Sequence, residues 1–566
     1  NGMELPALDP NRNSAQLDLL PTAALDNIVV YKTFSPDLYA DFAGGYVDMS
    51  TKDFPEQFTL SASAGFGINT NAHLRGERLA YAAPASTHAL GFGAQQHALP
   101  ASVAAYAQGS FPQFQAQNSG INAQQGQQLA AATRSFDHQN AWRFERRALP
   151  INQQFSLALG NQHQVFKRPF GWNAALSYSR QANAYENGQY GIYELSGQYD
   201  AANSLITQLS LRDEWSSDEV LIGALLSASY KLQPNHQISV LALHNQSSEY
   251  QVRDLIGRKQ RDEPSDVFQT RTWGYQQRAI SAAQLRTQHL FPSLHNLELR
   301  AQADYVRSTQ KEPDLRYFTN RYNADGDVFF IKPSSDRLPS RFYRDMQQDN
   351  YSARIDATLP LKNINIKAGA YYTQRARQFG EKRYTFASSG IAYEGDMSAY
   401  FAEENLTNLT YNELGEAHHS AGIYAVDDLD PANTYQAAQQ IASAYGLADL
   451  QIDRLRIHAG VRMEQTRTQL HTESALVLQR YPQLDGKENI LDNLDFLPAL
   501  NLQYELPKQQ KLRFSYSRTI ARPSFRELAP FASFDVEGGF LLAGNPALQR
   551  SIIDNIDLRW ERYTKD

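Results

Sequence analysis

The sequence predicts an all-β protein, a large transmembrane antiparallel β-barrel. Three observations lead to this fold class. Apolar and polar residues alternate along many segments, which is the pattern of a strand with two different faces. The alternating segments are longer than the usual strand of about 5–6 residues, and about 9–11 residues of tilted strand cross a bilayer. The links between them are alternately short and long, as in barrels with short turns on one side of a membrane and long loops on the other.

The composition agrees with a barrel and excludes several other classes. The 566-residue chain is 11% aromatic, with 31 Tyr and 28 Phe, yet its mean hydropathy is -0.53, as expected when only alternate residues face lipid. No run of about 18 apolar residues marks a transmembrane helix. The net charge of -7 argues against a nucleic-acid partner. The absence of cysteine excludes disulfides, thiolate metal sites and cysteine nucleophiles.

The clearest strands lie in the second half of the chain. Residues 297–305, 364–372 and 455–463 are apolar at every second position and polar or charged between. Short links with Pro and Asn join neighbouring strands as turns. Long polar loops are predicted at 70–150, 254–269, 310–348, 386–435, 471–492 and 523–552, with about 16 or 17 strands in all. A soluble sandwich is the alternative, but it normally has shorter strands.

The first 55 residues have a different pattern. They indicate a compact α/β piece, with one strand at 28–32 and a second strand after the pair Gly44 and Gly45, where the backbone is expected to be tight. The first barrel strand is expected near Phe58. We therefore divide the chain into an N-terminal unit, residues 1–55, and a barrel, residues 56–566.

Two parts of the chain resemble TonB-dependent outer-membrane receptors. Residues 26–55, from DNIVVYK through DFAGGYV to TK, resemble the end of the plug domain of that family, with Asp41, Gly44, Gly45 and Val47 as the plug motif. Residues 519–528 (TIARPSFREL), 544–548 (GNPAL) and 555–561 (NIDLRWE) resemble its late barrel strands. The chain is most similar to the Bacteroidetes variety, in which a carboxypeptidase-regulatory-like domain precedes the plug.

This resemblance implies a 22-stranded barrel whose lumen holds an α/β plug. Residues 1–55 would be the C-terminal part of the plug, and the rest of it, the regulatory domain and any TonB box would lie upstream of Asn1. The last residues do not form the amphipathic final strand of such barrels, so the C-terminal strands are expected to be missing. We expect a partial receptor that does not close by itself, with long extracellular loops at 70–150, 310–348, 386–435 and 523–552.

No catalytic motif is found in the sequence. It has no phosphate-binding loop, no G-x-S-x-G and no H-E-x-x-H, so we expect a protein that is not an enzyme and uses no cofactor. His418 and His419 near Glu416, and the Asp-rich stretch 427–430, could bind a metal ion. Solvated loop residues are the better interpretation, and no metal site is predicted.

Aromatic residues of the long loops form the candidate ligand site. They are Tyr317, Phe318, Tyr322, Phe329, Phe330, Phe534 and Phe540. Aromatic faces suit sugars, peptides and hydrophobic chelates alike. Packing between loops is the alternative role for these residues.

The predicted function is that of a TonB-dependent receptor in the outer membrane of a Gram-negative bacterium. The resemblance implies capture of a scarce extracellular ligand and import into the periplasm, energised by the TonB complex through an upstream segment. Outer-membrane lipids are expected partners, and a SusD-type surface lipoprotein lid is a further candidate. The main alternative is a surface adhesin or an anchor of a larger envelope assembly; a loop-borne hydrolase or an unplugged porin fits less well. The sequence selects no ligand, oligomeric state or role for the Ala- and Gln-rich stretch 94–133.

Overall fold

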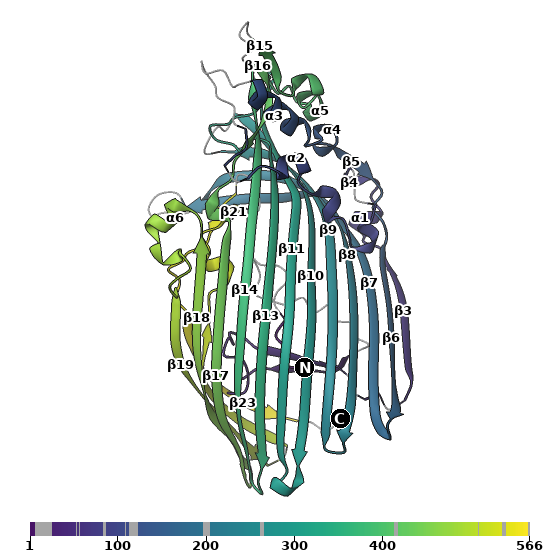
Figure 1. Cartoon of the computed structure of the whole chain (residues 1–566), viewed down its shortest axis with the longest axis vertical. Helices are drawn as coiled ribbons and strands as arrows, with labels where there is room; N and C mark the ends of the chain where they lie inside the picture. Colours follow the sequence, from purple (N-terminus) through teal and green to yellow (C-terminus); the bar gives the residue numbers. More distant parts are fainter. Residues whose placement is uncertain are drawn as a thin grey trace.

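The chain folds as a barrel of antiparallel strands with a helical cap at one end (Figure 1). This computed structural model describes residues 1–5, 25–51, 54–55, 57–82, 86–107, 109–112, 123–195, 204–260, 265–411, 417–507, 509–534 and 539–563. The barrel strands, in order, are β3 (Thr59–Gly67), β6 (Asn152–Val165), β7 (Arg168–Leu195), β8 (Leu205–Gln233), β9 (His236–Lys259), β10 (Asp266–Phe291), β11 (Leu297–Asn323), β12 (Val328–Phe330), β13 (Ser340–Pro360), β14 (Ile364–Ser389), β15 (Asn408–Tyr411), β16 (Ala417–Asp427), β17 (Tyr435–Ile452), β18 (Leu455–Thr472), β19 (Leu491–Leu506), β20 (Gln510–Ala521) and β23 (Ser551–Arg562). The predicted all-β class is confirmed.

The alternation in the sequence gives the wall an apolar outer face. The register places Leu226 of β8 beside Ala242 of β9, followed by Ala283 of β10, Tyr305 of β11 and Tyr351 of β13. This outward row is open to the surroundings, since Leu226 is 60% exposed and Tyr351 is 55% exposed. Such a row is suited to lipid, because an outward apolar band is what a bilayer requires of a barrel.

The rows of side chains between these outward rows face the lumen and carry charge. Asp304 of β11 is buried there and accepts hydrogen bonds from Gln284 of β10 at 2.9 Å and from Ser352 of β13 at 2.8 Å. Arg354 and Asp356 of β13 form an ion pair at 2.7 Å. Polar side chains of a wide barrel satisfy one another in this way across neighbouring strands.

Several strands are longer than the sequence predicts. β7 to β11 have 24–29 residues, or roughly 80–95 Å at about 3.3 Å per residue, and extend well beyond any bilayer. The loop predicted at 310–348 is wrong in extent, because β11 and β13 leave only 324–339 between them; the loop predicted at 254–269 is shortened likewise. Residues 313–322 are almost all buried on both faces, so apolar and polar residues no longer alternate there.

The strand order closes into a ring in which β23 is followed by β3. Registers join β20 to β23 and β3 to β6, but among the described strands none joins β23 to β3, so the expectation that this chain does not close by itself stays a prediction. This junction also differs from the rest of the wall. β3 is exposed at eight of its nine residues, and most of β23 is exposed as well. Neither face of the junction is covered as the other strands are.

A small N-terminal piece lies inside the barrel (Figure 1). Residues 1–5 and 25–51 form this luminal segment, whose hairpin pairs β1 (Leu25–Tyr31) with β2 (Tyr46–Thr51). Asn1 joins the two parts: its side-chain amide donates to Thr51 Oγ1 at 2.9 Å and its amino group to Asp48 Oδ1 at 3.1 Å. The loop between β1 and β2 reaches the barrel wall.

A cap covers the long-loop end of the barrel. Its elements are α1 (Thr70–His73), β4 (Arg78–Tyr81), η3 (His88–Leu90), η4 (Ala94–His97), α2 (Ala101–Ala104), α3 (Ala123–Arg134), α4 (His138–Ala141), β5 (Phe144–Arg147), α5 (Met397–Tyr400), η7 (Glu403–Asn405) and η8 (Pro431–Asn433). Trp142, Phe401 and Phe386 pack in its core against Trp273 and Phe318 of the barrel strands. The stretch 94–133 thus contributes helices to the cap.

The remaining elements lie in loops. They are η6 (Pro292–Leu294), α6 (Ala475–Arg480), η9 (Pro482–Leu484), α7 (Phe525–Leu528), β21 (Ala532–Phe534) and β22 (Leu541–Ala543). α7 begins with a capping box in which Ser524 and Glu527 bond each other's backbone N–H groups. Within the described ranges, every helix is too short or too polar to span a membrane.

Candidate functional site

The luminal segment rests on a small apolar contact with the wall. Its loop contributes four side chains, and β19 and β20 contribute three: Phe34, Leu38, Ala40, Phe42, Leu497, Ala499 and Ile520. The Ile520 N–H also donates to the Ala40 carbonyl oxygen at 3.1 Å. This apolar contact fixes the position of the loop, and polar contacts surround it.

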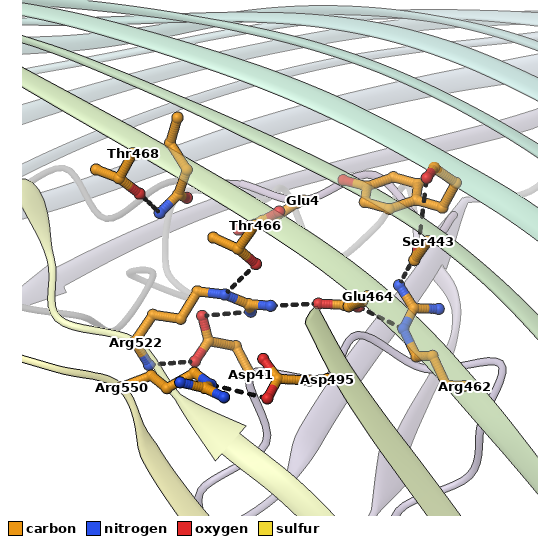
Figure 2. A network of polar contacts seen from close by, with 12 residues as sticks. Glu4, Asp41, Ser443, Arg462, Glu464, Thr466, Thr468, Asp495, Arg522 and Arg550 are labelled. Carbon is orange, nitrogen blue, oxygen red and sulfur yellow. Dashed lines mark hydrogen bonds and ion pairs between the residues drawn. The ribbon is translucent and has the colours of Figure 1, made fainter. Parts of the chain in front are cut away.

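A charged network holds the same loop (Figure 2). Glu464 of β18 lies between Arg462 and Arg522 and accepts hydrogen bonds from both guanidinium groups. Arg522 reaches Asp41 of the luminal segment twice, from its backbone N–H at 3.0 Å and from its guanidinium at 3.4 Å. The Arg462 guanidinium donates to the Pro36 carbonyl oxygen at 3.4 Å. Glu464 therefore orients two cations that both contact the luminal segment.

Two further ion pairs join the luminal segment to β14. Lys367 Nζ donates to Asp37 Oδ2 at 2.5 Å, and Arg375 binds Glu4 at 2.6 Å. Burial alone would raise the pKa of Asp37, but Lys367 outweighs it and holds that pKa below its ordinary value. All four side chains keep 20–36% of their surface exposed, so each pair contributes little, about 0–1 kcal/mol. Many weak polar contacts, rather than a large core, hold the luminal segment.

A cavity of about 950 Å³ lies near the long loops, and we call it the mouth cavity. A second cavity of about 550 Å³, the lower cavity, lies between the luminal segment and the wall nearer the short turns. Along β10, residues 272–278 line the first and 286–288 line the second, a separation of roughly 26 Å of strand. On β14 the order is Phe379 at the mouth cavity, Arg375 at the luminal segment and Lys367 at the lower cavity. The luminal segment therefore lies between the two cavities.

The mouth cavity has aromatic and charged walls. Tyr317 and Phe534 pack with ring centroids 4.9 Å apart, and Phe379 and Phe531 at 4.7 Å. Its charged lining residues are Glu219, Glu249, Arg278, Glu312, Arg344, Arg526 and Glu527. Apolar surface with a few placed charges is typical of ligand sites.

The structure separates the seven aromatic residues that the sequence singles out. Tyr317 and Phe534 are brought together in the lining of the mouth cavity, although more than 200 residues separate them in the chain. Phe318, the next residue after Tyr317, points the other way into the core of the cap. Neighbouring positions of one strand serve different surfaces because successive side chains alternate.

The other four residues lie outside the mouth-cavity lining. Tyr322 of β11 packs on Phe329 of β12 at 4.6 Å, beside Phe330 on the same short strand. Phe540 is 68% exposed in the loop before β22. The pair of Tyr322 and Phe329 fits the alternative of packing between loops.

The plug-motif residues occupy distinct positions in the luminal segment. Asp41 contacts Arg522 in the charged network. Val47 pairs with Val30 in the hairpin. A Cβ on Gly45 would come within 3.3 Å of the Tyr31 carbonyl oxygen, a tight contact, whereas Gly44 has open space.

Sequence reasoning missed the residues that organise both regions. Arg522 stands in the ARPSF stretch and Glu464 in an alternating strand, but nothing local in the sequence indicates their contact with each other or with Asp41, 481 positions from Arg522. The available signal was the alternation, which places Arg462 and Glu464 on one inward face. Arg526, which lines the mouth cavity, carried no such signal.

Metal binding finds no support among the described side chains. They contain no cluster of three or more His, Asp or Glu residues able to hold an ion. Glu416 and the side chains of His418 and His419 lie outside the described residues.

Comparison with known proteins places the barrel in the outer membrane. Residues 398–565 match a family described as "Outer membrane protein beta-barrel family". No curated protein matches the chain. The solved structures it resembles include the open form of the ferric-catecholate import receptor Fiu from E. coli K12, with 10% identity and a TM-score of 0.33 over 90% of this chain and 77% of that one. The copper transporter OprC matches with 11% identity and a TM-score of 0.27 over 91% and 70%. The RagAB peptide importer matches with 10% identity and a TM-score of 0.31 over 88% and 65%.

The chain is thus an outer-membrane β-barrel protein, and the predicted location is confirmed. The family match covers residues 398–565, and the barrel strands before them continue the same wall from β3 to β14. The outward apolar rows supply the lipid-facing surface that this location requires.

Proposed function

We propose that this protein is a TonB-dependent receptor that captures an extracellular ligand in the mouth cavity and imports it into the periplasm. The observation that carries the proposal is the place of the luminal segment, between two cavities and attached by weak polar contacts. In this proposal the luminal segment is the end of a plug. A ligand that enters from the mouth must pass it to reach the lower cavity.

The energetics of the attachment support a plug that moves. A segment held by a large apolar core would resist displacement as one unit, because all of its buried area would be lost together. Here the ion pairs to Lys367 and Arg375 are partly hydrated, and Asp41 in the pair with Arg522 is 42% exposed, so the pairs can break one after another, the first two at a cost of about 0–1 kcal/mol each. Force from an energised periplasmic protein would suffice for such a sequence of small steps, and no covalent chemistry is needed.

The experiment that tests this function is a pull-down with the soluble C-terminal domain of TonB. The receptor is solubilised from native membranes and compared with a form that lacks the region upstream of Asn1. Capture that requires the upstream region is the expected result. Failure of an intact, folded receptor to bind TonB would refute energised import.

A surface adhesin or assembly anchor is the second candidate, and the cap is the observation that favours it. The cap has its own aromatic core over the barrel mouth and offers a large surface to another protein. In the same pull-down, mass spectrometry of co-purifying proteins would identify an envelope partner or a surface lipoprotein lid. An envelope partner without TonB would make the anchoring function the better one.

A further inference from the structure

The charges of the mouth cavity are separated between two sides. Glu219 and Glu249 come from β8 and β9, whereas Arg526 comes from α7 and is bonded to residues at β21. Figure 1 shows β8 and β9 on the right of the barrel and β21 on the left. A ligand in this cavity therefore meets Glu219 and Glu249 on one side. On the other it meets the Arg526 guanidinium, with Glu527 of the same helix engaged in the cap of α7.

The acidic side places two glutamates next to each other. The register places Glu219 directly opposite Glu249 on the neighbouring strand, an arrangement in which like charges repel. Arg278 also acts electrostatically on Glu249. A cationic group of a ligand beside this pair would relieve the repulsion between the two carboxylates.

The basic side presents a guanidinium with uncharged acceptors. Arg526 donates to the Phe531 carbonyl oxygen at 2.8 Å, to Ser533 Oγ at 2.8 Å and to the Leu542 carbonyl oxygen at 3.3 Å. Its guanidinium lies 4.3 Å over the Phe531 ring, and its buried Nε has no hydrogen-bond acceptor among the described residues. A cation in this state gains from an anion, because charge-assisted hydrogen bonds are stronger than neutral ones.

The neighbouring arginine has the carboxylate partners that a buried guanidinium normally has. Arg344 also lies over Phe531, and it is bound to Glu381 at 2.7 Å and to Glu312 at 3.2 Å. Those two carboxylates are therefore already engaged. The described side chains provide no equivalent pair for Arg526, although both arginines line the same cavity.

We propose that the mouth cavity binds a zwitterionic ligand with an apolar or aromatic body, such as a short peptide with free termini. The cationic group lies at Glu219 and Glu249, the anionic group at Arg526, and the body on the rings of Tyr317 and Phe534. The cavity of about 950 Å³ is of the size that holds a small organic ligand. This inference rests on the proposed function, because it assigns the class of ligand that the receptor captures.

Calorimetric titration of the purified receptor with three tripeptides tests the proposal. The probes are alanyl-phenylalanyl-alanine with free termini, its N-acetyl form and its C-terminal amide. The free peptide should bind, and each capped form should bind about tenfold or more weakly, since each has lost one charged contact. Equal binding of the free and capped peptides would overturn the proposal, as would no binding of any of them to a folded receptor.

Two variants assign the ends. Arg526→Gln should weaken binding of the free peptide about tenfold or more but leave the affinity of the C-terminal amide unchanged. Glu249→Gln should weaken binding of the free peptide to a similar extent but leave the affinity of the N-acetyl peptide unchanged. Lys487→Gln, an exposed loop cation at 84% side-chain exposure, is the charge-matched control and should change nothing. If a variant loses the same affinity for the capped peptide as for the free peptide, its side chain does not interact with that terminus, because groups without coupling have additive effects. That result would refute the assignment of that end.

The two proposals fail separately. Peptide binding without capture by TonB would keep the ligand class and refute energised import. Capture by TonB of a receptor that binds none of the three peptides would keep import and refute the ligand class.

Discussion

Replacing Glu464 with Gln is expected to make the luminal segment harder to release, whereas replacing Asp41, one of its direct anchors, should loosen it. The change leaves Arg462 without a carboxylate and leaves Arg522 with Asp41 alone, and breaking a buried pair costs about 3–5 kcal/mol. In the variant the two cations still contact Pro36 and Asp41 while the luminal segment is in place, but its departure would leave both cations without these contacts and without a carboxylate. Hydrogen bonds to charged groups are worth about 1.5–3 kcal/mol, so the release equilibrium should shift about 10- to 100-fold.

The absence of native cysteine provides a clean assay for this release. Ser50→Cys in β2 places a single thiol on the luminal segment, and the rate of maleimide labelling reports its exposure. Asp41→Asn should raise the rate slightly, because Asp41 is 42% exposed, whereas Glu464→Gln should lower it. Asp495→Asn is the matched control: it removes an equally buried carboxylate whose partner is Arg550 of the wall. Equal rates in the Glu464 and Asp495 variants would refute the reasoning.

Three other predictions concern the wall, the cap and pH. Ala242→Arg in the outward row should lower stability in bilayers by about 2–4 kcal/mol, seen as a lower denaturation midpoint, whereas arginine at Gln237, which lines the lower cavity, should not. His138 is buried in the cap, and burial lowers its pKa to about 3. The stability of the cap should therefore fall by about 1.4 kcal/mol per pH unit as the pH drops from about 6.5 toward 3. Amide hydrogen exchange of α3 measures this dependence, and His138→Asn should abolish it. Because Lys367 holds the pKa of Asp37 below 3.8, their pair persists above about pH 4 and is lost below it. Maleimide reacts with the thiolate, so each rate is divided by that of free cysteine at the same pH. This normalised labelling of the luminal segment should be constant from pH 8 to 5 and rise only below about pH 4, and Lys367→Met should remove that rise; a rise that begins near pH 6 would contradict it.

The sequence predicts the wall well because strand alternation is local information. Residues 297–305 show their outward and inward positions within nine letters, and the register places them so. The same reasoning fails at 313–322, where the strand rises above the bilayer and is covered on both faces. The environment that imposes the alternation ends there, and the pattern ends with it.

The candidate site could be predicted only in part, because its contacts depend on how distant segments meet. Tyr317 and Phe534 could be selected as aromatic loop residues, but their meeting at 4.9 Å is set by the path of the loop after β20. Arg526 has its significance only through what surrounds it, three uncharged oxygens and an aromatic ring. The residue type alone does not show whether an arginine has a carboxylate partner in the fold.

The pairing of charges within the wall bears on whether the luminal segment can leave and return. Arg354, Arg462 and Arg522 all donate to the luminal segment, yet each also has a carboxylate of the wall, Asp356 for the first and Glu464 for the other two. When the segment departs, these cations keep a partner, and the cost of an isolated buried charge does not arise. Among the described contacts, Arg522 would lose Asp41 but keep Glu464, whereas Lys367 and Arg375 would lose the carboxylates that they bind on the segment, and both are partly exposed to water. A wall that balances most of its own charge makes displacement of the segment cheap and reversible, which a repeated import cycle requires.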